Sequence, residues 1–191
     1  MRGLITLLER DCEVTLIPSG ERMVLPAGTE VQVQQTLGGN VTVQAMYGQL
    51  MRIDEKDAEA LGPGYMASVQ KPEPAPTAAA EGAEGEQAYS EEALWEQLRT
   101  VYDPEIPVNI VELGLVYECK ATPLEQGGHK VDLRMTVTAP GCGMGPVLQE
   151  DVKRKALNVP GVKEANVELV WDPPWDQSRM SDVARLQLGW M

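Results

Sequence analysis

Residues 129–146 read HKVDLRMTVTAPGCGMGP, and this stretch decides the fold of the C-terminal half of the chain. Apolar and polar side chains alternate through its first part, which is the period-two pattern of a β-strand with one buried face. A glycine-rich loop follows, and Pro146 suits the first turn of a helix because that position needs no backbone N–H donor. We therefore predict a strand, a loop and a helix that ends near Leu157. The buried face of the strand should hold Val131, Leu133, Met135 and Val137.

Further helices and strands are predicted on both sides of this stretch from caps and apolar periodicity. Before it we expect a helix capped by Ser90 and a strand with Leu115, Tyr117 and Cys119 on one face. After it we expect a strand from Val162 to Trp171, with Ala165, Val167, Leu169 and Trp171 on one face, and a short helix near 181–188. The order α-β-β-α-β-α predicts an α+β fold, a compact sandwich with helices on one face of a small mixed sheet.

The N-terminal part of the chain has the periodicity of a small antiparallel β domain, residues 1–67. Gly38-Gly39-Asn40 separates two alternating runs as a hairpin turn does, and Asp54 can cap one short helix. Residues 71–88 are rich in Pro, Ala, Gly and Glu and have no large apolar side chain, so we predict a linker over 68–89. The C-terminal domain then spans 90–191.

Composition excludes several kinds of partner and site. The chain has 16 Lys and Arg against 29 Asp and Glu, and its net charge of -13 makes nucleic acid an unsuitable partner. No stretch is long enough to span a membrane, and the first residues are too short for a signal peptide, so we expect no membrane partner and a cytoplasmic location. The three widely spaced cysteines favour free thiols, and the single histidine, His129, excludes a histidine triad or a multi-histidine metal site.

Cys142 is the candidate functional residue of the glycine-rich loop. A cysteine just ahead of a helix start meets unpaired N–H groups and the positive end of the helix dipole, which both favour the thiolate. A thiolate binds soft metals or attacks electrophiles. Two other interpretations stay open from these residues alone: a small buried side chain in a turn, or a phosphate-binding loop that lacks the usual glycine-lysine motif.

Three separated motifs of the C-terminal half resemble a known family. They are YDPEIPVNIVELGLVY at 102–117, TAPGCGMG at 138–145 and VWDPPW at 170–175. In this order they resemble the SufT-type proteins of the PaaD-like iron-sulfur cluster assembly family, over roughly residues 90–191. The resemblance implies a non-enzymatic accessory factor in iron-sulfur cluster assembly or in the maturation of iron-sulfur client proteins.

The same resemblance implies the site residues. Cys142 is then the central residue and the metal ligand, and Asp103, Glu105 and Thr138 are further candidates for cofactor binding. The implied cargo is an iron-sulfur cluster or iron, held transiently or not at all at rest, and the implied partners are assembly proteins and client apo-proteins. Many relatives have Cys-Pro in this loop, whereas Gly143 follows the cysteine here, which keeps the thiol and alters the loop.

Several of these residues also allow a structural interpretation. An Asp before a Pro is ordinary helix-stop chemistry, so Asp103 need not belong to a site. Trp171 and Trp175 either pack in the core, which we favour, or form a docking surface. We expect Cys119 in the core and His129 in a solvated turn.

Three function classes remain: an assembly factor, a protein-interaction adaptor without metal handling, and a cysteine-dependent enzyme. We expect no enzyme, because a nucleophilic cysteine usually needs a base such as histidine nearby and no Cys-x-x-Cys motif is present. Iron-sulfur clusters usually take four protein ligands, mostly cysteine thiolates, and one chain supplies one well-placed thiolate. A stable cluster should therefore bridge two chains in a homodimer.

Overall fold

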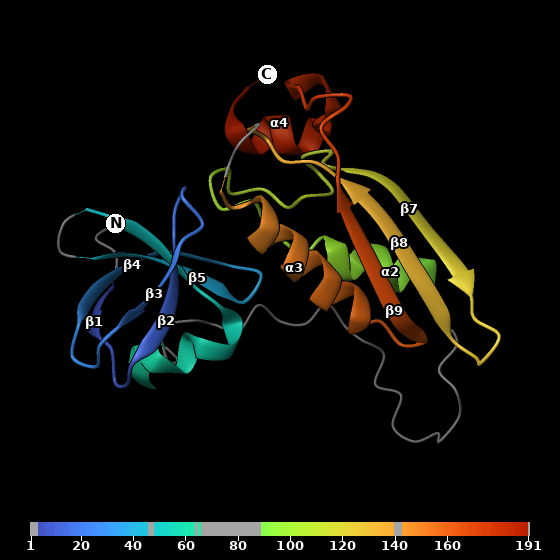
Figure 1. Cartoon of the computed structure of the whole chain (residues 1–191). Helices are drawn as coiled ribbons and strands as arrows, with labels where there is room; N and C mark the ends of the chain where they lie inside the picture. Colours follow the sequence, from blue (N-terminus) through green and yellow to red (C-terminus); the bar gives the residue numbers. More distant parts are fainter. Residues whose placement is uncertain (1–3, 46–47, 64, 66–88, 140–142, 191) are drawn as a thin grey trace. The chain divides into compact units, whose positions relative to one another are not determined.

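The computed structural model describes residues 4–45, 48–63, 65, 89–139 and 143–190 (Figure 1). The chain divides into two compact units, one N-terminal and one C-terminal. Apart from Tyr89, the predicted linker lies outside the described residues, so its limits stay a prediction. No helix in the described ranges is long and apolar enough to cross a bilayer.

The N-terminal unit is a six-stranded sheet in the order β1-β4-β5-β6-β2-β3, in which every neighbouring pair is antiparallel. Leu37 pairs with Asn40 across the β4-β5 turn, which confirms the predicted hairpin. The turn needs glycine, because Gly38 and Gly39 have φ angles of 61° and 88°. The strands are β1 (Ile5–Leu7), β2 (Cys12–Leu16), β3 (Arg22–Leu25), β4 (Glu30–Leu37), β5 (Asn40–Ala45) and β6 (Leu50–Ile53).

A 3-10 helix, η1 (Glu55–Leu61), closes the core of this unit with the buried side chains of Ala60 and Leu61. The predicted short helix is therefore present, but in the tighter 3-10 form. The predicted cap is wrong: Asp54 makes no side-chain cap bond and instead pairs with the buried Arg52 at 3.2 Å.

The C-terminal unit follows the predicted order of helices and strands, with one added 3-10 turn. Ser90 Oγ accepts the N–H of Ala93 at 3.3 Å and so caps the first helix as expected. The elements are α2 (Glu91–Leu98), β7 (Val116–Pro123), β8 (His129–Met135), α3 (Gly145–Leu157), β9 (Val162–Leu169), η2 (Gln177–Arg179) and α4 (Asp182–Leu188).

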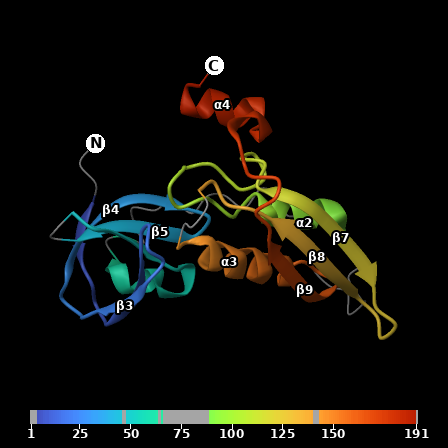
Figure 2. The ribbon, with the colours of Figure 1, turned by 45° about the horizontal axis from the view of Figure 1, so that its top comes forward.

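The sheet of the C-terminal unit has the order β7-β8-β9, with β7 antiparallel and β9 parallel to β8. A parallel neighbour needs a crossover, and α3 supplies it (Figure 1). Helices α2 and α3 cover the same face of this sheet, since Leu98 and Val152 share one core with Leu133 (Figure 2). The opposite face carries half-exposed ion pairs, such as Lys130–Asp132 at 3.0 Å. The α+β sandwich with helices on one face of a mixed sheet is therefore confirmed.

Two predicted strand faces were wrong. A bulge at Tyr117 shifts the register, so Val116 lies opposite Met135 and joins Cys119 on the core side in place of Tyr117. The last strand ends at Leu169 rather than Trp171. Its alternation breaks there because Val170 turns inward to the core while Trp171 is 52% exposed.

His129 was also placed wrongly by the sequence. It is the first residue of β8, and its ring stacks on Tyr89 with the ring centres 4.5 Å apart. The side chain is half-buried and not part of a solvated turn.

We predict that residues 90–191 fold without the rest of the chain. The described residues of their core lie within this range, from Ala93 to Leu188, and Tyr89 packs at its edge directly before it. A fragment of residues 89–191 should therefore be soluble and unfold in one cooperative transition, followed by circular dichroism against the full chain. A fragment without a cooperative transition would contradict this domain boundary.

Candidate functional site

The loop that follows α2 is folded around the side chain of Asp103. Its Oδ1 atom accepts the backbone N–H groups of Glu105 at 2.8 Å and Ile106 at 2.9 Å. The main chain closes over it, because the Asp103 N–H donates to the Val108 carbonyl at 3.2 Å. Asp103 is only 4% exposed. The side chain that was expected to stop a helix therefore organises its own loop.

The second oxygen of Asp103 contacts another segment of the chain. The Thr138 hydroxyl donates to Asp103 Oδ2 over 3.5 Å, which is a long hydrogen bond. Thr138 comes three residues after β8 ends, so this contact joins the α2 loop to the connection that leads toward α3. Glu105 takes part through its backbone, and its side chain is exposed. The structure thus brings Asp103, Glu105 and Thr138 together.

Cys142 lies outside the described residues, together with the two residues before it. The described chain resumes at Gly143, and α3 begins at Gly145. The first turn of α3 contains no acidic residue, and Met144 at the N-cap makes no side-chain cap bond. No side chain at these described positions neutralises the positive end of the helix.

Burial dominates the electrostatics of Asp103. It raises the pKa of this carboxyl above its ordinary value of 3.8, because a charged carboxylate loses its hydration inside the protein. The N–H groups of Ile106 and Glu105 act in the opposite direction by bonding the charged form, and the nearby Glu105 charge adds to the increase. The carboxylate of Asp103 has its acceptor positions engaged within the fold and is poorly placed as an open metal ligand.

The two described cysteines are poor thiolates. Burial raises the pKa of Cys12 to about 11, with a further increase from Asp57, and raises that of Cys119 to about 11, with a further increase from Glu91. Cys12 is fully buried in the N-terminal core, and Cys119 is half-buried against the C-terminal core, as expected for it. Both are free thiols. Neither has the electropositive surroundings of a reactive cysteine.

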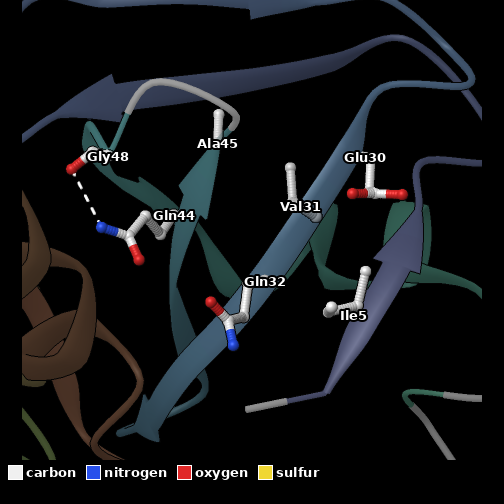
Figure 3. A pocket seen from close by; sticks show the side chains of 7 residues that line it. All are labelled: Ile5, Glu30, Val31, Gln32, Gln44, Ala45 and Gly48. Atoms are coloured by element: carbon white, nitrogen blue, oxygen red, sulfur yellow. Dashed lines mark hydrogen bonds between the residues drawn. The ribbon is translucent and has the colours of Figure 1, made fainter. Parts of the chain in front are cut away.

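The described residues contain no group of three His, Cys, Asp or Glu side chains that could hold a metal ion. The N-terminal unit has a shallow hollow of about 280 Å³ between β1, β4 and β5 (Figure 3). Gln44 at its rim already donates to the Gly48 carbonyl at 3.0 Å, and no predicted site residue lies there. The hollow is lined by Ile5, Glu30, Val31, Gln32, Gln44, Ala45 and Gly48.

The structure adds a second capping residue that the sequence analysis did not single out. Asn109 Oδ1 accepts the N–H groups of Val111 and Glu112 at 3.1 and 2.9 Å, as Asp103 does at the start of the same loop. The sequence did contain a signal for this residue. Asp103 and Asn109 lie six positions apart, and Asp and Asn side chains can accept backbone N–H groups two and three residues ahead.

The C-terminal segment rests on the end of this loop. Trp175 Nε1 donates to the Leu113 carbonyl at 2.7 Å, which confirms the packing role favoured for this tryptophan. Ser181 bonds Glu112 through both its backbone and its hydroxyl. Gly114, at φ 69°, allows the approach, because a Cβ there would lie 2.3 Å from the Arg179 carbonyl oxygen.

Comparison with known proteins identifies the C-terminal unit. A family model described as "Iron-sulfur cluster assembly protein" matches residues 91–169. A "Fe-S protein maturation auxiliary factor" from Porphyromonas gingivalis is 42% identical over 103 residues, which cover 53% of this chain and 93% of that protein. The chain belongs to the iron-sulfur cluster assembly protein family.

Two further relatives agree with this membership. The "Fe-S protein maturation auxiliary factor YitW" of Bacillus subtilis is 40% identical over 103 residues, 52% of this chain and 97% of that protein. The "Fe-S protein maturation auxiliary factor SufT" of Staphylococcus aureus is 40% identical over 89 residues, 47% of this chain and 97% of that protein. The resemblance to the SufT branch of the iron-sulfur cluster assembly family is confirmed, and the family match begins at residue 91, after the N-terminal unit.

The bonds of Asp103 predict different effects for two substitutions. Asp103→Ala leaves two N–H groups without their acceptor and should lower the free energy of unfolding by about 2 kcal/mol. Asp103→Asn keeps an acceptor oxygen and should cost much less. Chemical denaturation of both variants tests this, and equal losses would show that the carboxyl group does not act as an N–H acceptor.

The pH dependence of the same pair follows from the raised pKa of Asp103. A group with a raised folded pKa contributes stability below its unfolded pKa and loses it as the pH rises through the folded pKa. The melting temperature of Asp103→Asn relative to wild type should therefore increase between pH 4 and pH 7. A difference that falls over this range would contradict the burial argument.

The thiol pKa values predict a labelling pattern. Far below a pKa of about 11 the thiolate fraction rises tenfold per pH unit, so iodoacetamide labelling of Cys119 should climb about tenfold per unit from pH 7 to pH 10. Cys12 should stay unlabelled until the chain is denatured, because it is 0% exposed. Peptide mass spectrometry gives both rates, and a Cys119 rate that levels off near pH 9 would indicate an ordinary thiol.

Proposed function

We propose that the chain is a cytoplasmic, non-catalytic auxiliary factor for the maturation of iron-sulfur proteins and that it acts through the thiol of Cys142. The observation that carries the proposal is the 42% identity over 93% of the maturation auxiliary factor of Porphyromonas gingivalis. The family match over residues 91–169 includes Asp103, Thr138 and Cys142. Its partners are then iron-sulfur assembly proteins and the apo-proteins that receive iron or a cluster.

The contrast between the thiols supports Cys142 as the working group. Cys12 and Cys119 have pKa values of about 11, so at neutral pH they are almost entirely protonated. Cys142 stands three positions before the first residue of α3, whose first turn has no acidic side chain and no side-chain cap. A thiolate close to such a helix start is stabilised by the free N–H groups and the helix dipole.

The oxygen-bearing residues have different roles in this proposal. Asp103 acts as a positioning residue, because its bonds to Glu105, Ile106 and Thr138 fix the start of the connection that carries the thiol. The exposed carboxylate of Glu105 and the hydroxyl of Thr138 are the groups that we propose as weak oxygen ligands to iron. The buried Asp103 carboxylate is occupied and contributes indirectly.

Iron or a cluster is the cargo, and its binding is labile because one chain supplies too few ligands. A cluster usually takes four ligands, mostly cysteine thiolates. The thiols of Cys12 and Cys119 have pKa values of about 11 and are poor ligands at neutral pH, so a second chain, a small thiol or the cysteines of a client complete the ligands of Cys142. Incomplete ligation by the factor favours transfer to a client that offers a full set.

Two other functions fit less well. A cysteine-dependent enzyme would need a base near the thiol, but His129 stacks on Tyr89 at the far end of β8, a strand of seven residues that spans roughly 20 Å. An adaptor without metal handling would use the surface alone. Such an adaptor would tolerate replacement of Cys142, which separates it from the proposed factor.

Anaerobic reconstitution and complementation test the proposal. Wild type, Cys142→Ser and the matched control Cys119→Ser are incubated with iron and sulfide and passed through size-exclusion chromatography with absorbance near about 420 nm. Wild type and Cys119→Ser should carry absorbance in a dimer fraction only, and Cys142→Ser should carry none, because a hydroxyl is a poor ligand for a soft metal. The same variants are expressed in a strain deficient in iron-sulfur maturation.

Full growth rescue by Cys142→Ser would reject the thiol mechanism in favour of an adaptor. A brown monomer that survives chromatography would show that one chain supplies enough ligands. Loss of rescue with Cys119→Ser as well as with Cys142→Ser would mean that Cys119 also contributes to function or that the substitution disrupts folding. Circular dichroism of the two variants distinguishes these outcomes.

A further inference from the structure

The segment that follows β9 is held at the end of the sheet by hydrogen bonds. The Val170 N–H donates to the Met135 carbonyl of β8 at 2.8 Å. A few residues later the Pro173 carbonyl accepts the hydroxyl of Tyr117, on β7, at 2.9 Å. The backbone between these two bonds is therefore fixed, and it carries Trp171.

Trp171 and the next residue, Asp172, have no partners of their own in the described parts of the chain. The Trp171 side chain is 52% exposed, and no described residue bonds its indole N–H or stacks on its ring. Asp172 is also exposed, and no described cation pairs with it. A large ring on a fixed backbone loses little conformational freedom on binding, which is typical of an interaction hot spot. The pair thus offers a ring and a carboxylate to a partner.

The charge around this pair selects a cationic partner. Residues 170–182 contain three Asp and one Arg, and the whole chain has a net charge of -13. Asp176 keeps its charge in mildly acidic solution, because hydrogen bonds from Ser178 lower its pKa below the ordinary value of 3.8. A cationic segment is attracted to this surface at long range, whereas a polyanion or a second copy of the chain is repelled.

The neighbouring η2 turn contains a contact of the kind that such a partner would make. The guanidinium carbon of Arg179 lies 4.3 Å from the centre of the Tyr117 ring. A guanidinium stacks on a ring and keeps N–H donors for a carboxylate, which a lysine ammonium does less well. Tryptophan is the aromatic side chain on which a cation binds best. Trp171 next to Asp172 therefore suits arginine in particular.

The pair lies at the end of the sheet that carries the candidate site. Strands β8 and β9 are parallel, and Met135 pairs with Leu169, so both strands leave the sheet at the same end. Thr138 comes three residues after Met135, and Trp171 comes two residues after Leu169. A partner held at Trp171 is thus held at the end of the sheet from which the chain continues toward Cys142.

We propose that Trp171 and Asp172 bind an arginine side chain of the apo-protein that receives iron or a cluster. The guanidinium stacks on the indole ring and donates N–H groups to the Asp172 carboxylate. The identity of this partner rests on the proposed function. The contact itself needs neither iron nor Cys142.

NMR titration of the full apo chain with short peptides tests the contact. The probe is a capped Gly-Arg-Gly-Arg-Gly peptide, compared with peptides that carry Lys or Glu in place of Arg. The indole N–H signal of Trp171, assigned with Trp171→Phe, should shift with a Kd on the order of 1 mM in about 50 mM NaCl. Binding should weaken several-fold in about 500 mM NaCl, because salt screens the attraction. The lysine peptide should bind more weakly, and the glutamate peptide should not bind.

Three variants locate the contact, with binding followed on the backbone amide signals of the same segment. Trp171→Ala should weaken binding of the arginine peptide about tenfold, and Asp172→Asn about threefold. Trp190→Ala is the matched control, because Trp190 is also exposed, at 47%, but lies after α4. This control should bind the peptide like wild type.

The remaining outcomes overturn the proposal. Equal binding by wild type and Trp171→Ala would show only a general attraction to an acidic protein, and a shift of the Trp190 signal alone would place the contact elsewhere. In the strain deficient in iron-sulfur maturation, Trp171→Ala should rescue growth less well than Trp190→Ala. Full rescue by Trp171→Ala would show that client proteins do not use the contact. Cys142→Ser should bind the peptide like wild type, so failure of the thiol mechanism gives a different result.

Discussion

The fold of the C-terminal unit depends on one buried carboxylate. Asp103 holds two N–H groups of its own loop and reaches Thr138 beyond β8, so a single side chain sets the position of two connections at one end of the sheet. The same loop then carries Leu113, on which Trp175 rests. Burial of a charge is unfavourable, and here the bonds to the loop offset only part of that cost. The loops at this end of the sheet are thus held in place by one buried acidic side chain.

The regular part of the fold was predictable because apolar alternation is a local property. The run from Val131 to Met135 predicts a buried strand face, and the face is buried. Exceptions arose where one residue interrupts the alternation: the bulge at Tyr117 puts Val116 in place of Tyr117 on the core side of β7, and Val170 takes the inward position that would otherwise fall to Trp171. Such shifts depend on pairing with distant strands, which a single segment does not encode.

The candidate site was predictable only in part. The residue types predicted a turn at Asp103 and a reactive thiol at Cys142. The family resemblance placed Asp103 and Thr138, which are 35 positions apart, in one site. Their contact follows from the way α2 and β8 pack, and neither residue shows it alone. Asp103 was expected either to bind a cofactor or to stop a helix, and its buried bonds show instead that it anchors its own loop. Burial also separates Cys119 from a reactive thiol, which its strand position already indicated.

The parallel pairing of β8 and β9 has a consequence for synthesis of the chain on the ribosome. β7 and β8 are joined by a short turn and can form a hairpin as soon as both have emerged. The other edge of β8 finds its partner only after α3 and residues Val162–Leu169 have followed. Until then the hydrogen-bonding groups of an apolar central strand are open to other nascent chains. The period between these two events is when this protein most needs protection from aggregation.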